Sequence, residues 1–299
     1  MTLISYFWPI MIKYNPKIWF TQILKVPKSD TLRILLPEML ILASMTAVLT
    51  HVELTYFKDL HIFKDAIAVY SLIGFVLSLL LVFRTNTAYD RWWEGRKRWG
   101  ELVNNTRTLA IKIASTTNDK NTISFFNRMI SNYVFALKWH LRDESEELTI
   151  ALSDEENQGF YAASHKPSYI SQLMYNRLRV MKNKGEISDI EYLAMDTNLN
   201  TFSNITGACE RIKNTPMPYS YNLFLKKFIF IYVFTLPIGF VSSFGYGTVL
   251  IAVFIFYILV SIEVLAEEIE DPFGQDDNDL PLDDIAQRIK ANVGDILKE

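Results

Sequence analysis

The residues best suited to chemistry in this chain form an acidic cluster near its C-terminal end. On either side of the sequence PFGQ, the cluster comprises Glu267, Glu268, Glu270, Asp271, Asp276, Asp277, Asn278 and Asp279. Carboxylate oxygens at such close spacing are the ligands that Ca²⁺ prefers. The order does not fit an EF-hand loop, which needs a Gly at its sixth position and a Glu at its twelfth. From the spacing alone we favour a solvated turn that pairs with basic residues over a Ca²⁺ site.

Other kinds of reactive site find little support in the sequence. It has no phosphate-binding glycine loop, no dinucleotide fingerprint and no zinc-protease histidine pair. The histidines are scattered, at His51, His61, His140 and His165, so we expect no histidine-based metal or catalytic site. The lone Cys209 excludes an intramolecular disulfide, and we expect it to pack between helices rather than to act as a nucleophile. We therefore predict that the protein is not an enzyme.

The elements that carry these residues are predicted to be helices, four of which span a membrane. Residues Ala66–Phe83 contain no charge and are long enough to cross a bilayer as one helix. Three further apolar stretches are Ile34–Val52, Phe228–Phe244 and Thr248–Ile262. Glu38 lies near the start of the first stretch. We interpret it as an interfacial or interhelical hydrogen-bonding group, with a functional intramembrane carboxylate as the alternative.

The charges that flank these spans predict their orientation. Lys and Arg are frequent before the first span, after the second and before the third, whereas the loop 53–65 has only Lys58 and Lys64. The positive-inside rule therefore places both termini and the long middle segment in the cytoplasm. Trp92 and Trp93 follow the second span, as is typical of a membrane interface. A net charge of −3 gives no global basic field, so we expect no nucleic-acid partner.

The middle segment reads as helix nearly throughout. One helix begins at a cap formed by Asp119 or Asn121, and others cover 168–182 and 189–212, whereas 145–167 is predicted to be a helix edge plus a loop. The fold class is therefore an all-α membrane protein. We divide it into five segments. A cytosolic or interfacial N-terminal segment (1–33) precedes the first two spans (34–83). A cytosolic helical region (84–221), two further spans (222–266), and an acidic turn with a C-terminal helix (267–299) follow.

Three long tracts, taken in order around the four spans, resemble the bacterial branch of the bestrophins. They are AYDRWWEGRKRWGELVN, CERIKNTPMPYSY and EEIEDPFGQDDNDLPLD. Bestrophins are pentameric ion channels with four spanning helices and a helical cytosolic region per subunit around one central pore. The resemblance implies a homopentamer in the bacterial inner membrane that passes small inorganic ions, with chloride favoured by family usage. A monovalent-cation channel of the same fold and a non-conducting membrane-anchored sensor or scaffold are the alternatives.

The resemblance also assigns residues to the ion pathway. The family's narrow apolar neck is lined by three positions on the second span, which in this chain are Phe75, Leu79 and Phe83. Their spacing of four agrees with one helix face, and we expect Leu72 and Val76 to lie on other faces. The family's second, cytosolic constriction falls on the helix 189–212, where Ile190 and Leu193 are both candidates.

The Ca²⁺ clasp of animal bestrophins lies after a Pro-Phe-Gly sequence. Asp276 and Asp279 occupy the matching positions, and Asp271 precedes the proline. Asn278 interrupts the acidic run, and Leu280 and Pro281 stand where animal members have Phe-Glu. These departures count against Ca²⁺ gating, so the turn is interpreted as either a Ca²⁺ site or a brace for the N-terminal segment. No cofactor is expected to be required.

Overall fold

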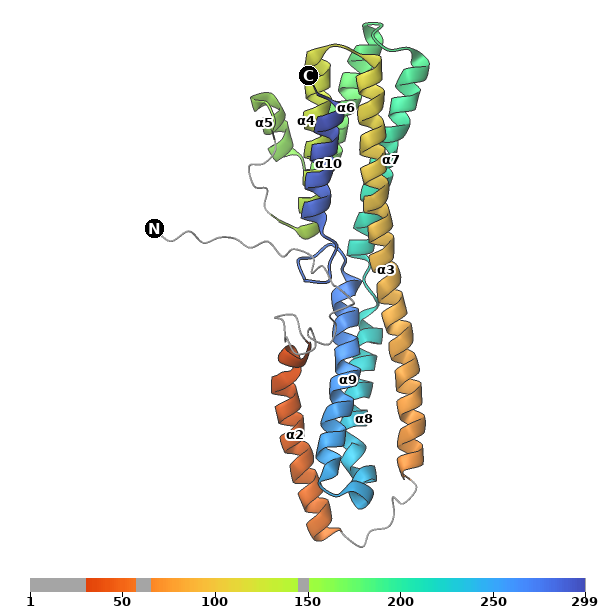
Figure 1. Ribbon diagram of the computed structural model, residues 1–299, viewed down its shortest axis with the longest axis vertical. Coiled ribbons are helices and arrows are strands. Elements are labelled where there is room, and N and C mark those ends of the chain that lie inside the picture. The colour runs from red at the N-terminus through yellow and green to blue at the C-terminus, as the bar shows by residue number, and fades with distance from the viewer. Residues whose placement is uncertain (1–30, 58–65, 145–150, 299) are drawn as a thin grey trace, which may run out of the picture. The chain divides into compact units, whose positions relative to one another are not determined.

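The structure is a computed structural model that describes residues 31–57, 66–144 and 151–298, and every regular element in those ranges is an α-helix (Figure 1). The chain divides into two compact units. The first, which we call the transmembrane unit, holds the described residues up to 90 and residues 216–270. The second, which we call the bundle unit, holds the described residues of 91–215 and 271–298.

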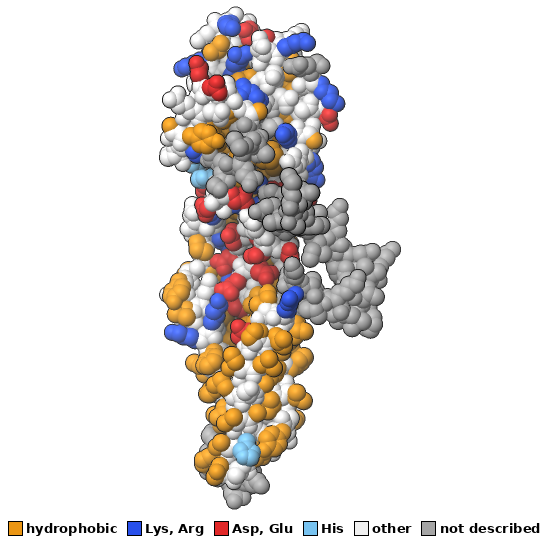
Figure 2. Space-filling model, turned by 90° about the vertical axis from the view of Figure 1, so that its left-hand side faces the viewer, with side chains coloured by type: hydrophobic (Ala, Val, Ile, Leu, Met, Phe, Trp, Pro, Cys, Tyr) orange, Lys and Arg blue, Asp and Glu red, His pale blue; other side chains and the backbone are white. Residues whose placement is uncertain are grey.

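The transmembrane unit contains α2 (Thr31–Tyr56), the first part of α3 (Ala66–Thr116), α8 (Tyr219–Phe244) and α9 (Gly247–Glu270). Each of the four is long and apolar enough to cross a membrane, which confirms the four predicted spans. The helices α2, α8 and α9 pack against one another. Hydrophobic side chains also cover much of the outer surface of this unit (Figure 2). Such a surface suits lipid or another apolar partner but not water.

Close contact between α3 and α8 depends on two glycines. The ring of Tyr70 on α3 lies against Gly239, where an added Cβ would come within 2.6 Å of a ring carbon. Tyr232 on α8 lies against Gly74 in the same way, with its hydroxyl 2.6 Å from the position of a Cβ. The Tyr70 hydroxyl donates a hydrogen bond of 2.6 Å to the carbonyl of Thr235. Each helix therefore supplies one tyrosine and one glycine, and each glycine leaves room for the tyrosine ring of the other helix.

The second span does not end where its apolar sequence ends. Beyond Phe83 the helix α3 continues without interruption through the basic tract to Thr116. No proline or glycine pair interrupts the tract, and its Arg, Lys, Glu and Leu residues favour helix. Charge therefore marks the predicted end of the apolar stretch but does not terminate the helix.

The bundle unit contains the remainder of α3, α4 (Lys120–Arg142), α6 (Lys166–Asn183), α7 (Asp189–Asn214) and α10 (Leu282–Ile296). Asp119 caps α4 by accepting hydrogen bonds from the backbone N–H groups of Asn121 and Thr122. Of the two predicted caps, the first is therefore the one used. The predicted helices over 168–182 and 189–212 are confirmed as α6 and α7, and α4 packs against α6, α7 and α10.

One predicted loop is wrong in part. The segment 145–167 contains a further helix, α5 (Asp154–Ala162), while its residues 145–150 lie outside the described residues. Ser153 and Glu156 form a reciprocal capping box at the start of α5, and Arg128 on α4 pairs with Glu156 at 2.5 Å. These contacts outweigh Gly159, whose missing side chain leaves room for the ring of Tyr169.

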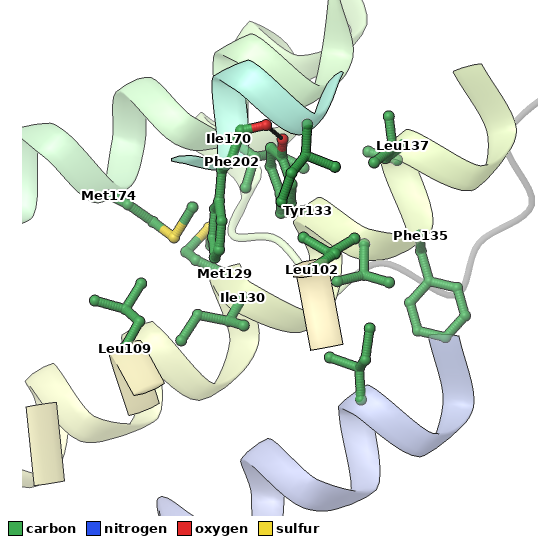
Figure 3. Packing of buried hydrophobic residues seen from close by; sticks show 14 of the residues in the cluster. Leu102, Leu109, Met129, Ile130, Tyr133, Phe135, Leu137, Ile170, Met174 and Phe202 are labelled. Atoms are coloured by element: carbon green, nitrogen blue, oxygen red, sulfur yellow. Dashed lines mark hydrogen bonds between the residues drawn. The ribbon is translucent and has the colours of Figure 1, made fainter. Parts of the chain in front are cut away.

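The core of the bundle unit is apolar and includes one aromatic stack (Figure 3). The rings of Tyr133 on α4 and Phe202 on α7 lie 4.7 Å apart and nearly parallel. The buried Tyr133 hydroxyl donates to the carbonyl of Phe202 at 2.7 Å and lies 2.5 Å from the hydroxyl of Thr206. Its polar atom is thereby satisfied, as burial requires. The stack fixes α7 against α4.

Candidate functional site

One face of α3 in the transmembrane unit is apolar and exposed. Phe75, Leu79 and Phe83 lie on it with exposed fractions of 67%, 45% and 56%. The opposite face carries Leu77 and Leu81, which are buried against α8 and α9. Nothing else among the described residues of this unit covers the exposed face. A helix with such a face in a membrane must meet lipid, a pore or another copy of the chain.

The predicted neck residues share this face with two residues that we had placed elsewhere. Leu72 and Val76 are both exposed. At 3.6 residues per turn, Leu72 lies about two full turns before Leu79 and therefore on the same face. Val76 stands in the same relation to Phe83, seven residues further on, and is likewise exposed. The prediction that Leu72 and Val76 lie on other faces is therefore wrong, and neither residue can serve as a control for the neck.

The two candidates for the cytosolic constriction lie at the start of α7 in the bundle unit. Ile190 and Leu193 are both exposed. They are three residues apart and share one face of the helix. The first turn is held by Ser188 and Glu191, which form a capping box. Two exposed apolar side chains on a rigid helix end fit a constriction, and both residues stay candidates.

The acidic cluster is split between a helix and a turn. Glu267, Glu268 and Glu270 lie on α9, whereas the aspartates lie in the turn before α10. In the turn, Asp279 is 5% exposed, and its Oδ2 accepts a hydrogen bond of 2.7 Å from the N–H of Asp276. Gly274 packs on the same carboxylate, where a Cβ would lie 2.6 Å from Oδ2. The turn therefore closes around a buried carboxyl group.

Burial leaves that carboxyl group in an unusual state. Desolvation, together with the charges of Asp276 and Asp271, raises the pKa of Asp279 to about 7. Its Oδ1 is buried and accepts no hydrogen bond from the described residues. An orphaned carboxylate oxygen is a ligand that suits a hard cation such as Ca²⁺. Among the described residues, however, the carboxylates of Asp271, Asp276 and Asp279 do not lie close enough together to form a metal-binding group, so Ca²⁺ binding by this turn stays a prediction.

The turn is held by α3 and α4 rather than by a basic cluster. Trp92 donates from Nε1 to the carbonyl of Asn278 at 3.0 Å, and Arg142 donates from Nε to the carbonyl of Phe273 at 3.2 Å. The Phe273 side chain is fully buried in the core of the bundle unit. Arg91 donates to the carbonyls of Ile212 and Thr215. Backbone carbonyls of the turn are thus held by the indole of Trp92 and the guanidinium of Arg142.

A buried ion pair lies directly after the neck in the transmembrane unit. The Arg84 side chain is fully buried, with Nη2 2.6 Å from Oε2 of Glu270 and Nε 3.7 Å from Oε2 of Glu263. The other oxygen of Glu270 accepts a hydrogen bond of 2.6 Å from the N–H of Met217, just before α8. One arginine thus joins α3 to α9, and Glu270 joins α9 to the start of α8. From the sequence we had read Arg84 only as a flanking charge.

The remaining candidate residues gain no new role from the structure, with one exception. Cys209 is buried, and desolvation raises the pKa of its thiol to about 12, as expected of a packing residue. Glu38 lines a groove between α2, α8 and α9 together with Lys226, Glu263 and Glu267. His61 lies outside the described residues. The exception is the pair His140 and His165, which meet at Glu210 although the sequence gave no reason to expect it.

Comparison with known proteins decides the family. The model of the bacterial and fungal bestrophin proteins matches residues 11–295. The chain belongs to the bestrophin family. A voltage-dependent anion channel-forming protein of Nostoc sp. is 38% identical over 229 residues, which cover 74% of each chain. A protein of the same description from Mesorhizobium japonicum is 31% identical over 292 residues, covering 97% of this chain and 94% of its own.

A solved structure shares the fold of this chain over most of its length. The crystal structure of a bacterial bestrophin homologue from Klebsiella pneumoniae superposes with a TM-score of 0.83 at 28% sequence identity, covering 89% of this chain and 99% of that chain. The resemblance seen in the sequence is therefore confirmed. So are the all-α fold with four membrane-spanning helices and the prediction that this bestrophin is a channel-family protein and not an enzyme.

The buried arginine gives a first prediction. Arg84→Met should destabilise the bestrophin by about 3–5 kcal/mol, because it leaves Glu263 and Glu270 buried without a cation. Thermal unfolding of the purified protein in mild detergent measures the loss. Lys226→Met is the matched control, since the ion pair from Lys226 to Glu267 is about half exposed and should contribute under about 1 kcal/mol. Equal losses in the two variants would contradict a structural role for Arg84.

The raised pKa of Asp279 gives a second prediction. The folded chain favours the protonated acid, so this contribution to stability is full below about pH 4 and is lost as the pH rises to about 7. A Ca²⁺ chelator is present throughout. Between pH 5 and pH 8, the free energy of unfolding of the wild type should fall by about 2–3 kcal/mol more than that of Asp279→Asn, because one pKa unit corresponds to about 1.4 kcal/mol. Melting curves across this range measure the difference. Asp277→Asn, in the same turn, should keep the wild-type slope, and a wild-type slope in Asp279→Asn would show that the carboxyl group is ionised when folded.

Proposed function

We propose that this bestrophin is an oligomeric channel that passes small anions passively, with chloride favoured, through an apolar neck formed by α3. The observation that carries the proposal is the exposed face of Phe75, Leu79 and Phe83 on a membrane-spanning helix whose other face is packed. The named relatives, described as voltage-dependent anion channel-forming proteins, support an anion as the permeant ion. Hydrophobic constrictions gate by dewetting, so such a neck needs no catalytic residue and no cofactor.

The proposed assembly is a homopentamer. The four spans of one subunit pack around an apolar core, and no polar channel runs through the described part of the transmembrane unit. A water-filled pathway must then form between copies, and closed rotational symmetry is the usual outcome of such contacts. The fivefold count comes from the family. The bestrophin resemblance and the Klebsiella homologue support it by fold.

Membrane orientation and the acidic turn complete the proposal. We place the channel in the bacterial inner membrane with both termini in the cytoplasm, as the flanking Lys and Arg indicate, and a fluorescent protein fused to either end should then fold and fluoresce. The turn acts as a brace for the N-terminal segment, most of which lies outside the described residues. Ca²⁺ is its alternative role, which the orphaned Oδ1 of Asp279 supports. If Ca²⁺ binds, adding it should offset the loss of stability of the wild type at pH 8. If Ca²⁺ has no such effect, the turn acts as a brace and not as a Ca²⁺ site.

The assembly is tested by mass. Native mass spectrometry of the protein released from mild detergent should give five copies of the 34.7 kDa chain as the main species. The physical reason is that five exposed α3 faces can close a ring around one pathway, whereas one or two cannot. A monomer or dimer as the main species under conditions that keep the protein folded would contradict the proposal.

The neck is tested by current. A triple variant combines Phe75→Ala, Leu79→Ala and Phe83→Ala. Its passage should be wider and hold water, so planar-bilayer conductance or open probability should rise severalfold. The matched control changes two phenylalanines and one leucine that are similarly exposed on α8 and α9, as Phe230→Ala, Leu250→Ala, Phe254→Ala. The control should conduct like the wild type.

Selectivity is read in the same recordings. With asymmetric KCl, the reversal potential of the wild type should lie on the side of the chloride equilibrium potential. Reversal toward the potassium potential would establish the cation-channel alternative, and no current from folded wild-type protein would favour the scaffold. Unchanged current in the neck variant, or an equal rise in the control, would show that another surface lines the pathway.

A further inference from the structure

We propose that His140, His165 and Glu210 form a binding site for a divalent transition-metal ion of the Zn²⁺ class in the bundle unit. The three residues come from the last turns of α4, from the position just before α6, and from α7. None of them belongs to the proposed neck, to the cytosolic constriction or to the acidic turn. The site therefore stands or falls independently of the proposed channel function.

The geometry brings three ligand atoms together. Nε2 of His140 and Nε2 of His165 each lie 2.7 Å from the same oxygen, Oε1 of Glu210. All three atoms lie within 4.8 Å of one another, and the imidazole rings are 4.7 Å apart at their centres. In a tetrahedral Zn²⁺ site, with bonds of about 2.0–2.1 Å, ligand atoms lie about 3.3 Å apart. Each nitrogen–oxygen distance therefore has to lengthen by about 0.6 Å to admit an ion.

The ligand types select the class of ion. Two imidazoles and one carboxylate are a set that Zn²⁺ takes with water in the fourth position. Ca²⁺ and Mg²⁺ prefer sets made entirely of oxygen. The side chains are 31%, 33% and 29% exposed for His140, His165 and Glu210, so an ion and its water can enter.

Surrounding contacts fix the position of each ligand. The carbonyl of His140 accepts a hydrogen bond of 3.1 Å from Nζ of Lys213, which also pairs with Asp143 at 2.7 Å. Glu210 is next to Cys209, which is buried in the core of the bundle unit. His165 is the N-cap residue of α6, and its Nδ1 accepts the N–H of Ser168 at 3.1 Å. The site is thus anchored by three helices.

The capping bond also defines what metal binding must change. With Nδ1 as an acceptor, the proton of the neutral His165 ring lies on Nε2, where it is donated to Glu210. A metal ion on Nε2 moves that proton to Nδ1, and Ser168 then loses its acceptor. Metal binding and the N-cap hydrogen bond of α6 are therefore mutually exclusive. When the site is occupied, α6 loses its hydrogen bond to Nδ1 of His165, and the metal ion links α4, α6 and α7 instead.

Titration of the full-length protein tests the site. After EDTA treatment and dialysis in mild detergent, ZnCl₂ should bind with a stoichiometry of one per subunit by isothermal titration calorimetry and should raise the melting temperature, whereas MgCl₂ should not. Co²⁺, used as an optical probe, should give the visible absorption of a tetrahedral nitrogen–oxygen site. These readouts need no ion current.

The variants are chosen to keep the fold. His165→Asn retains an N-cap acceptor while removing Nε2, and His140→Gln retains a hydrogen-bond donor to Glu210. The double variant should lose the stoichiometric Zn²⁺ event and the Co²⁺ absorption. His51→Gln, which removes a histidine bonded to Tyr246, and the pair Asp276→Asn and Asp279→Asn should keep both. Undiminished Zn²⁺ binding in the double variant would overturn the proposal. So would absence of Zn²⁺ binding by the wild type, in which case the three residues form only a hydrogen-bonded link between helices.

Discussion

The burial of one positive charge sets the rotation of α3. Arg84 has no access to water, and a buried charge must be paired. Its partners Glu263 and Glu270 both lie on α9, so the side of α3 that carries Arg84 must face α9. Phe83 is the adjacent residue and points about 100° away. The ion pair therefore turns Phe83, and with it Leu79 and Phe75, out of the subunit.

That rotation leaves each subunit incomplete. A soluble protein would cover the exposed face with its own chain, and the described part of the transmembrane unit offers nothing to do so. In the membrane the apolar surface is tolerated, and the close packing of tyrosine on glycine between α3 and α8 keeps the helix from turning the face inward. Symmetric copies can then place their faces around a common axis. In the proposed channel the neck is thus a property of the assembly, for which the single subunit supplies only a correctly oriented helix.

The sequence predicted what depends on local pattern and missed what depends on distant partners. The four spans follow from charge-free length, and the Asp119 cap from its position. The helix α5 was missed because Gly159 was read as a breaker, although Ser153 and Glu156 have the capping-box spacing. Glu263 and Glu270 are seven residues apart and so share a face of α9, a signal that could have pointed to a buried partner for Arg84. The meeting of His140, His165 and Glu210 has no local signal, since these residues are separated by whole helices.

Two carboxyl groups near the end of α9 lie in opposite electrostatic surroundings. Glu270, the last residue of the helix, is paired with Arg84, whereas the turn that begins at Asp271 buries Asp279 with no arginine or lysine hydrogen-bonded to it among the described residues. A carboxyl group in the second situation is most stable when it is neutral or bound to a cation. Asp283, which follows on α10, is instead paired with Lys138 and Arg142 at 2.7 Å each, and these contacts lower its pKa. Burial therefore moves the pKa of Asp279 toward neutrality while the ion pairs of Asp283 move its pKa the other way, so the protonation of Asp279 changes near neutral pH.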